Sequence, residues 1–255
     1  MEVLLAGTYP EGTLEKFQNT FAGTDIHVRA VVTEAEFKKE SDVDAIILRI
    51  LKMPKEVINR FSPRLKMIMR WGAGYDAVDI KAARERNIDV CNTPGANAYA
   101  VSELAVLLML AVGRNLLAHE EKLREGVWSR ELFNKTSQSL RGKIVGIVGG
   151  GNIGRQVARK VQVFGAKTFY YDAFRLSEEM EQQLELQYVE YEQLLKESDV
   201  ITFHVPLMDS TAHMLNTENI SLLKQNAIVI NTARSGIIDD AALLEAVKNG
   251  HVLGA

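Results

Sequence analysis

Short apolar runs alternate with polar-faced stretches along the whole chain. Before Asn92 the apolar runs occupy residues 3–6, 26–32, 45–48, 65–69 and 88–91. Between them lie stretches with one polar face, such as residues 11–21, 34–40 and 80–86. Short buried strands that alternate with amphipathic helices are typical of βαβ units. The pattern therefore predicts a parallel sheet covered by helices.

A second alternating series follows a break at residues 92–95, where Pro94 and Gly95 interrupt the pattern. One long helix is predicted over residues 98–117. Strands are then predicted at 144–148, 168–171, 200–205, 227–231 and 251–253, and helices at 152–164, 191–196, 217–223 and 239–248. We therefore expect an α/β protein with two domains, residues 1–97 and 98–255, and a further linking stretch over residues 128–140.

Composition narrows the class of protein. The net charge is −3 and neither half is strongly basic, so we expect no nucleic-acid partner. The single cysteine, Cys91, excludes a disulfide framework within the chain, and no metal-ligand spacing occurs, so no metal is expected. The N-terminus does not look like a signal peptide, and the longest apolar run, residues 104–112, is too short for a membrane span. We expect a cytoplasmic protein without a membrane partner.

A glycine motif provides the strongest chemical signal. Gly149, Gly151 and Gly154 fit the pattern G-x-G-x-x-G between a predicted strand and a predicted helix. In dinucleotide-binding folds the first glycine permits a tight turn, the second lets the backbone approach a pyrophosphate, and the third lets helix and strand pack closely. The phosphates meet free N–H groups at the positive end of the helix dipole. The alternative is a glycine-rich turn that binds no ligand.

Asp172 favours the dinucleotide interpretation. It stands at the end of the strand that follows the glycine helix. An acidic side chain there accepts hydrogen bonds from the adenosine ribose and repels a 2′-phosphate. The predicted cofactor is therefore NAD rather than NADP.

Two further turns follow predicted strands. Arg234 stands in the segment Asn-Thr-Ala-Arg-Ser-Gly directly after the strand at residues 227–231, where its guanidinium can grip a carboxylate with two parallel hydrogen bonds. Residues 70–76 contain two close glycines whose N–H groups suit an anion, although this segment taken alone favours a plain turn. His204 stands at the end of another predicted strand. It could act as a catalytic base, but a histidine at a strand end more commonly makes only a local hydrogen bond.

These motifs together resemble those of the D-isomer-specific 2-hydroxyacid dehydrogenases, in the family's order and over nearly the whole chain. They are residues 70–76, 92–97 with 101–103, 140–143, 149–154, 199–207 and 231–236. The resemblance implies a flavodoxin-like substrate domain, residues 1–97, and a Rossmann-type, doubly wound NAD-binding domain, residues 98–255, with the active site between them.

The resemblance also implies roles for individual residues at the cofactor. It places Asn152 and Ile153 at the pyrophosphate and Asp172 at the ribose. It places Val205, Pro206, Thr232 and Ala233 along the rest of the dinucleotide.

For the substrate, the resemblance assigns Arg234 as the catalytic residue that binds the carboxylate and the keto oxygen. The backbone at Ala73 and Gly74 holds the other side of the carboxylate, with Ala73 near the nicotinamide, and Asn97 helps to orient the substrate. Arg49 matches a basic position of the family, where it suits a substrate phosphate, although a solvated strand end explains it as well. The acid is phosphoglycerate, lactate or a glyoxylate-type compound.

The implied reaction is hydride transfer between the nicotinamide and C2 of a 2-hydroxy acid. The family's acid–base histidine and its partner glutamate lie beyond a motif that would follow residue 255. We therefore expect an incomplete chain that by itself does not turn over substrate. One alternative is an inactive, NAD(H)-sensing protein of the co-repressor type, and another is a fragment that binds nothing. The resemblance further implies a homodimer, with the helix at residues 98–117 and apolar residues after it, including Leu132, at the contact.

Overall fold

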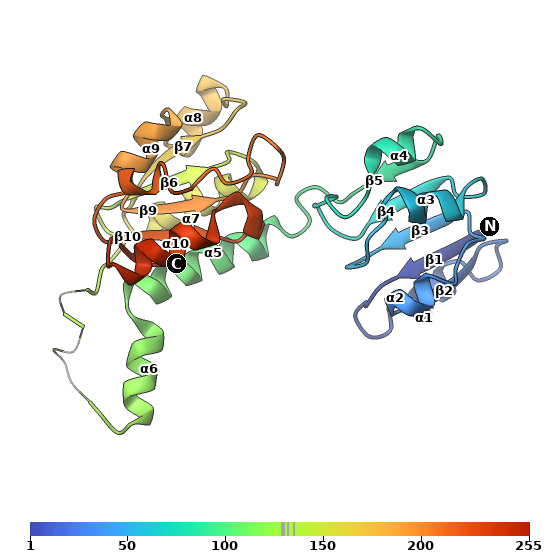
Figure 1. Ribbon diagram of the computed structural model, residues 1–255, viewed down its shortest axis with the longest axis horizontal. Coiled ribbons are helices and arrows are strands. Elements are labelled where there is room, and N and C mark those ends of the chain that lie inside the picture. Colours follow the sequence, from blue (N-terminus) through green and yellow to red (C-terminus); the bar gives the residue numbers. More distant parts are fainter. Residues whose placement is uncertain (129–130, 132, 135) are drawn as a thin grey trace. The chain divides into compact units, whose positions relative to one another are not determined.

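The computed structural model describes residues 1–128, 131, 133–134 and 136–255. The chain divides into two compact units, Met1–Asn97 (unit 1) and Ala98–Ala255 (unit 2). Each unit is built around one parallel sheet with helices on both faces (Figure 1). Leu132, which the sequence placed at a dimer contact, lies outside the described residues.

Unit 1 contains a five-stranded parallel sheet in the order β2-β1-β3-β4-β5. This is the flavodoxin-like order, so the predicted fold of unit 1 is confirmed. Apolar residues of α2, α3 and α4 cover one face of the sheet, and α1 covers the other. The elements are β1 (Glu2–Ala6), α1 (Thr13–Thr20), β2 (His27–Val31), α2 (Glu34–Phe37), β3 (Ala45–Leu48), α3 (Lys55–Phe61), β4 (Met67–Arg70), α4 (Ile80–Arg84) and β5 (Asp89–Cys91).

Unit 2 contains a six-stranded parallel sheet in the order β11-β10-β9-β6-β7-β8. Counted from β6, this is the doubly wound order 3-2-1-4-5-6 read from the opposite edge, so the Rossmann-type fold is confirmed. The strands are β6 (Ile144–Val148), β7 (Lys167–Tyr171), β8 (Leu186–Tyr188), β9 (Val200–Phe203), β10 (Ala227–Asn231) and β11 (Val252–Gly254). The chain reverses direction across the sheet between β6 and β9, and ligands of such folds collect at the carboxyl ends of these two strands.

Two hydrophobic clusters hold the helices of unit 2 against its sheet. Residues of α5 and α7 pack on one face, and residues of α9 and α10 pack on the other. The helices are α5 (Ala98–Gly113), α6 (Leu116–Arg124), α7 (Asn152–Val163), α8 (Glu178–Leu184), α9 (Tyr191–Glu197) and α10 (Asp240–Lys248), with short 3₁₀ turns η1 (Ile220–Leu222) and η2 (Ser235–Ile237).

The prediction of a single helix over residues 98–117 is wrong. It is two helices, α5 and α6, whose axes differ by 60°. Asn115 adopts the left-handed conformation, with φ of 51°, and ends the first run of helical hydrogen bonds. Residues 217–223 likewise form only the 3₁₀ turn η1. Among the described residues no single helix is long and apolar enough to cross a membrane, and α5 with α6 meets that test only as a bent pair.

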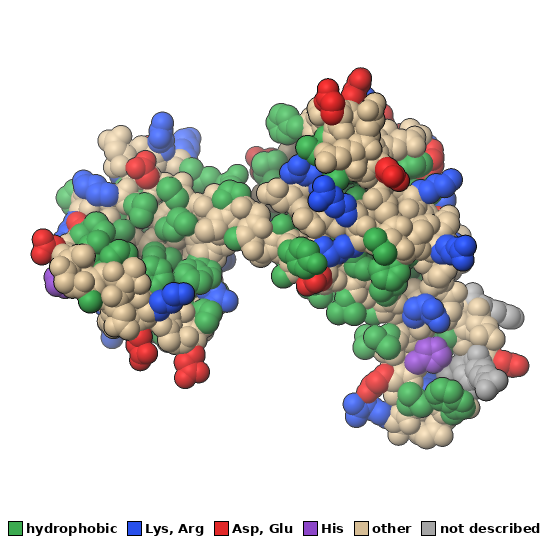
Figure 2. Space-filling model, turned by 180° about the vertical axis from the view of Figure 1, so that it is seen from behind, with side chains coloured by type: hydrophobic (Ala, Val, Ile, Leu, Met, Phe, Trp, Pro, Cys, Tyr) green, Lys and Arg blue, Asp and Glu red, His purple; other side chains and the backbone are tan. Residues whose placement is uncertain are grey.

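Large apolar side chains lie exposed on α5, on α6 and at the end of α7. Figure 2 shows hydrophobic side chains beside charged ones on the projecting end of unit 2. Leu117 and Trp128 are the most exposed in the α6 region, at 80% and 78%. The exposed set is Tyr99, Leu104, Leu107, Leu116, Leu117, Leu123, Val127, Trp128, Val163 and Phe164. Because α5 contacts both α6 and α7, these side chains lie on neighbouring helices, and exposed apolar surface of this kind is typical of an interaction site.

Candidate functional site: a dinucleotide cradle at the ends of β6, β9 and β10

The glycine turn after β6 packs so closely that two of its glycines have no room for a side chain. A Cβ on Gly149, whose φ is +106°, would lie 2.8 Å from the carbonyl oxygen of His204. A Cβ on Gly154 would lie 2.0 Å from the carbonyl oxygen of Gly149. The backbone N–H of Gly149 donates to the carbonyl of Tyr171 at 2.8 Å, which ties the turn to β7. These contacts fix the turn against the sheet.

Gly151 is different because a Cβ there would meet nothing within 4 Å. It is the N-cap of α7 and provides no side-chain cap. The hydrogen bonds recorded for the described residues include none donated by the N–H groups of Gly151, Asn152 or Ile153. An open space beside free N–H groups at a helix N-terminus is the arrangement that binds phosphate. The turn therefore fits the pyrophosphate of a dinucleotide.

Arg155, which the sequence analysis did not single out, adds a positive charge to this turn. Its Nε donates to the carbonyl of Gly151 at 3.2 Å, and its Nη2 donates to Oδ1 of Asn152 at 3.1 Å. Its position one turn into the helix after the glycine motif was the signal available in the sequence. The guanidinium favours an anion at the start of α7.

Asp172 follows β7 and is held beside the glycine turn. Its Oδ2 accepts a hydrogen bond from the N–H of Gly150 at 2.7 Å, and its Oδ1 accepts one from the N–H of Phe174 at 2.9 Å. Each carboxylate oxygen accepts more than one hydrogen bond, so capacity remains for ligand hydroxyls. The structure thus brings Asp172 and the glycine motif together, as a ribose–pyrophosphate site requires.

The ends of β9 and β10 contribute two buried polar atoms. Within the part of the chain that the structure describes, Nδ1 of His204 and Oγ1 of Thr232 are buried without a hydrogen-bond partner. Nε2 of His204 lies 2.9 Å from Oγ1 of Thr202, so this histidine makes the local hydrogen bond that the sequence left as one option. Burial lowers the pKa of His204 to about 4. Next to it, Val205 is half-buried and Pro206 is exposed.

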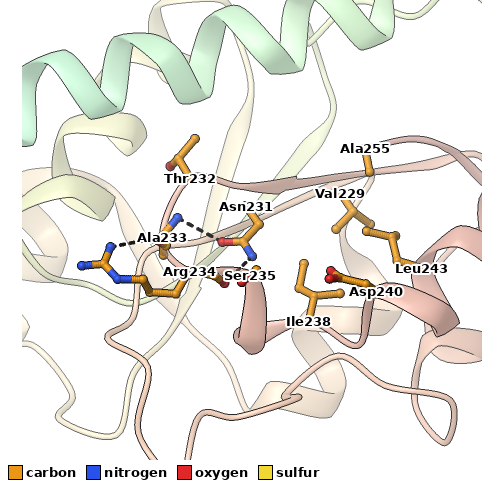
Figure 3. Close-up of a pocket in the computed structure, with 10 residues that line it drawn as sticks. All are labelled: Val229, Asn231, Thr232, Ala233, Arg234, Ser235, Ile238, Asp240, Leu243 and Ala255. Carbon is orange, nitrogen blue, oxygen red and sulfur yellow. Dashed lines mark hydrogen bonds between the residues drawn. The ribbon is translucent and has the colours of Figure 1, made fainter. Parts of the chain in front are cut away.

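The turn after β10 is organised by Asn231. Its Nδ2 donates to the carbonyl of Arg234 at 2.8 Å, and its Oδ1 accepts the N–H of Ala233 at 3.0 Å. The Arg234 guanidinium donates to the carbonyl of Ala233 at 2.8 Å. The residues of this turn border a cavity of about 470 Å³, in which the guanidinium points away from Asp240 and Leu243 (Figure 3). The turn places Thr232, Ala233 and Arg234 at the same sheet edge as the glycine motif, since β10 neighbours β9 and β9 neighbours β6.

In unit 1 the loop after β4 is fixed through its carbonyl groups. Nε of Arg70 donates to the carbonyl of Gly74 at 3.0 Å, and Nδ2 of Asn92 donates to the carbonyl of Ala73 at 2.7 Å. Among the residues that the structure describes, no hydrogen bond is donated by the N–H groups of Ala73 or Gly74, so both groups are available to a ligand. This arrangement suits the anion-binding reading of residues 70–76.

Arg49 follows β3, at the point where the strand order of unit 1 reverses. Its Nη1 donates to the carbonyl of Thr8 at 2.7 Å, and its own carbonyl oxygen would lie 1.7 Å from a Cβ on Gly7. The guanidinium is thus tied to the loop after β1. Asn97, the last residue of unit 1, is exposed.

Comparison with known proteins places these features in a family. The model of the D-isomer specific 2-hydroxyacid dehydrogenase NAD binding domain matches residues 106–255. A glyoxylate reductase of Thermococcus litoralis is 39% identical over 226 residues, which are 86% of this chain and 67% of that protein. A hydroxypyruvate reductase of Thermotoga maritima is 41% identical over 214 residues, which are 84% of this chain and 68% of that protein.

A solved structure supports the same assignment. The D-lactate dehydrogenase from Aquifex aeolicus, complexed with NAD and lactic acid, superposes with a TM-score of 0.87 at 27% identity. The match covers 99% of this chain and 75% of that one. With the family's motifs at the carboxyl edge of a Rossmann-type sheet, the chain belongs to the D-isomer specific 2-hydroxyacid dehydrogenase family.

Proposed function

We propose that the protein transfers a hydride between NAD(H) and C2 of a 2-hydroxy or 2-oxo acid. The observation that carries the proposal is the glycine turn, with open space at Gly151 and the carboxylate of Asp172 fixed beside it. The match of residues 106–255 to the family's NAD-binding domain supports the choice of cofactor.

In this proposal the dinucleotide is held along one sheet edge. Gly151, Asn152 and Ile153 donate backbone N–H groups to the pyrophosphate, and Asp172 accepts from the ribose hydroxyls. Gly149 and Gly154 hold the turn in shape, while Val205, Pro206, Thr232 and Ala233 line the path of the cofactor. Bound NAD(H) supplies a nicotinamide that accepts or donates the hydride.

Arg234 binds the substrate carboxylate and polarises the keto oxygen in this proposal. A guanidinium suits both tasks because it is always charged and donates in a fixed fork. In unit 1, Ala73 and Gly74 offer backbone N–H groups to a carboxylate, Arg49 suits an additional anionic group, and Asn97 helps to orient the substrate. The glyoxylate and hydroxypyruvate reductases among the relatives point to small 2-oxo acids as the substrate class.

His204 is not the acid–base group of this reaction. A general acid works best with a pKa near the operating pH. Because burial lowers the pKa of His204 to about 4, its imidazole is neutral at pH 7 and is a poor proton donor toward a developing alkoxide. We assign His204 instead to the wall of the cofactor path.

The test is NADH binding followed by turnover. NADH is titrated into the protein, and NADH oxidation is then followed with glyoxylate, hydroxypyruvate, pyruvate and phosphohydroxypyruvate. Binding with oxidation by at least one acid supports the proposal. In a full-length version of the protein, binding without turnover of any acid favours the NAD(H)-sensing alternative, and absence of binding refutes the dinucleotide site.

We propose further that the protein is a homodimer. The exposed apolar residues of α5 and α6, together with Trp128, support this, because a second copy would remove them from water. A two-fold contact between identical faces is the commonest solution for such a surface. Light scattering at micromolar concentration tests it, and a monomeric mass would contradict it.

A further inference from the structure

The loop between β7 and α8, residues 172–177, carries side chains suited to both kinds of nicotinamide dinucleotide. Asp172 suits the free ribose hydroxyls of NAD. Three residues later stands Arg175, the only basic residue of this loop. In dinucleotide-binding folds an arginine near the ribose accommodates the 2′-phosphate of NADP. The sequence alone therefore does not decide whether Arg175 is placed to bind a 2′-phosphate.

Arg175 is engaged by α8 on two of its nitrogens. Its Nε donates to Oε1 of Glu181 at 2.8 Å, and its Nη2 donates to Oε2 of the same residue at 2.9 Å. The guanidinium carbon also lies 5.0 Å from the centre of the Tyr188 ring. A bidentate pair that also stacks on an aromatic ring fixes the guanidinium in both position and plane.

Glu181 is itself held in place by a buried residue of β7. Its side chain is only 12% exposed, and its Oε1 accepts the hydroxyl of Tyr170 at 2.6 Å. Tyr170 is fully buried, and its hydroxyl oxygen also accepts the N–H of Leu176 in the loop. A Cβ on Gly150 would lie 3.2 Å from the Tyr170 ring. The glycine turn, the ribose loop and the Glu181–Arg175 pair are therefore parts of one packed assembly.

The charge of Glu181 persists at neutral pH. The hydrogen bonds from Arg175, and then the one from Tyr170, lower the pKa of Glu181 to about 2. The carboxylate thus remains available to hold the guanidinium over the whole range in which the protein would bind a dinucleotide.

We propose that Glu181 is a positioning residue for cofactor specificity. It holds the Arg175 guanidinium against α8, so that the loop presents the carboxylate of Asp172 to the ribose and presents no positive charge. The inference rests on the proposed NAD site and concerns the 2′-position of its adenosine ribose. When the carboxylate of Asp172 is neutralised, release of Arg175 from Glu181 supplies the cation that a 2′-phosphate needs.

The test is a set of NADH and NADPH titrations on five proteins: wild type, Asp172→Asn, Glu181→Gln, the double variant, and the double variant with Arg175→Gln. We expect the dissociation constant of NADPH to be at least about tenfold lower for the double variant than for Asp172→Asn, since a charged hydrogen bond to phosphate contributes at least that factor. Adding Arg175→Gln should remove the gain. NADH affinity should not rise with that of NADPH, so the ratio of the two dissociation constants changes.

The ratio separates this role from a merely structural one, because a damaged loop weakens both cofactors together. Glu192→Gln is the matched control: Glu192 pairs with Lys196 on the exposed side of α9, so its loss changes net charge equally and should leave the ratio unchanged. Should Glu181→Gln unfold the unit, Glu181→Asp tests the same contact with a carboxylate that is one methylene shorter.

Two results overturn the inference alone: equal NADPH affinities of Asp172→Asn and the double variant, or a gain that persists without Arg175. A wild-type protein that binds neither dinucleotide overturns the proposed function and this inference with it.

Discussion

Replacing the third glycine of the motif, Gly154→Ala, should destabilise unit 2. The new Cβ would lie 2.0 Å from the carbonyl oxygen of Gly149 and 3.0 Å from Cγ2 of Ile147. The nearer of these atoms belongs to the backbone, so α7 has to move away from β6. Overpacking of this kind costs roughly 1–3 kcal/mol, and the helix propensity of alanine returns about 1 kcal/mol.

The contact with a backbone atom places the cost at the upper end of that range, so we expect a net loss of about 2 kcal/mol. For a unit of this size that corresponds to a fall of roughly 4–8 °C in the midpoint of thermal unfolding. Calorimetry or circular dichroism measures it. An unfolding midpoint equal to that of the wild type would refute the packing argument.

Gly151→Ala is the matched control because its Cβ enters open space at a φ of −72°, which alanine adopts without strain. The weaker capping by alanine and the lower entropy of the unfolded chain offset each other to within about 0.5 kcal/mol. The methyl group would occupy the space assigned to the pyrophosphate, so NADH should bind roughly 5–150-fold more weakly. Unchanged NADH affinity would show that no pyrophosphate approaches Gly151.

Three further predictions concern pH and assembly. His204, whose pKa is lowered to about 4 by burial, contributes stability that is present above its unfolded pKa of about 6.5 and lost as pH falls toward 4. Urea midpoints of the wild type should therefore fall over that window more steeply than those of His204→Asn, and parallel curves would contradict the burial argument. Glu181, with its pKa lowered to about 2, contributes stability that is lost as pH falls from about 4.3 through 2, so Glu181→Gln should show a flatter profile there. A profile as steep as that of the wild type would exclude the Arg175 pairing as its cause. Leu117→Lys should shift the proposed dimer toward monomer in light scattering, and an undiminished dimer mass would place the contact elsewhere.

The sequence predicted the fold class correctly because alternating strands and amphipathic helices are local patterns. The errors fall where local pattern stops deciding structure. Residues 104–112 and 116–117 are apolar on both sides of Gly113, Arg114 and Asn115, and this interruption of three residues was too short for hydrophobic periodicity to reveal the left-handed backbone of Asn115. The three-residue strand β8, at the sheet edge, was too short to give a pattern of its own.

In the candidate site, too, the sequence revealed the features set by local spacing and missed those that depend on tertiary packing. Gly149, Gly151, Gly154 and Asp172 were readable because a turn and its neighbouring strand impose fixed spacings on the chain. The pairing of Arg175 with Glu181 was not readable, since it depends on how α8 folds back over Tyr170. The low pKa of His204 was also hidden, because it follows from burial at the end of β9.

The central claim is that Asp172 makes this sheet edge an NAD site. The most direct measurement is calorimetric titration of the wild type and Asp172→Ala with NADH and with NADPH. We predict that the wild type binds NADH more tightly than NADPH, and that Asp172→Ala narrows the gap by weakening NADH binding. Equal affinities of the wild type for the two cofactors, or an unchanged gap in Asp172→Ala, would contradict the account.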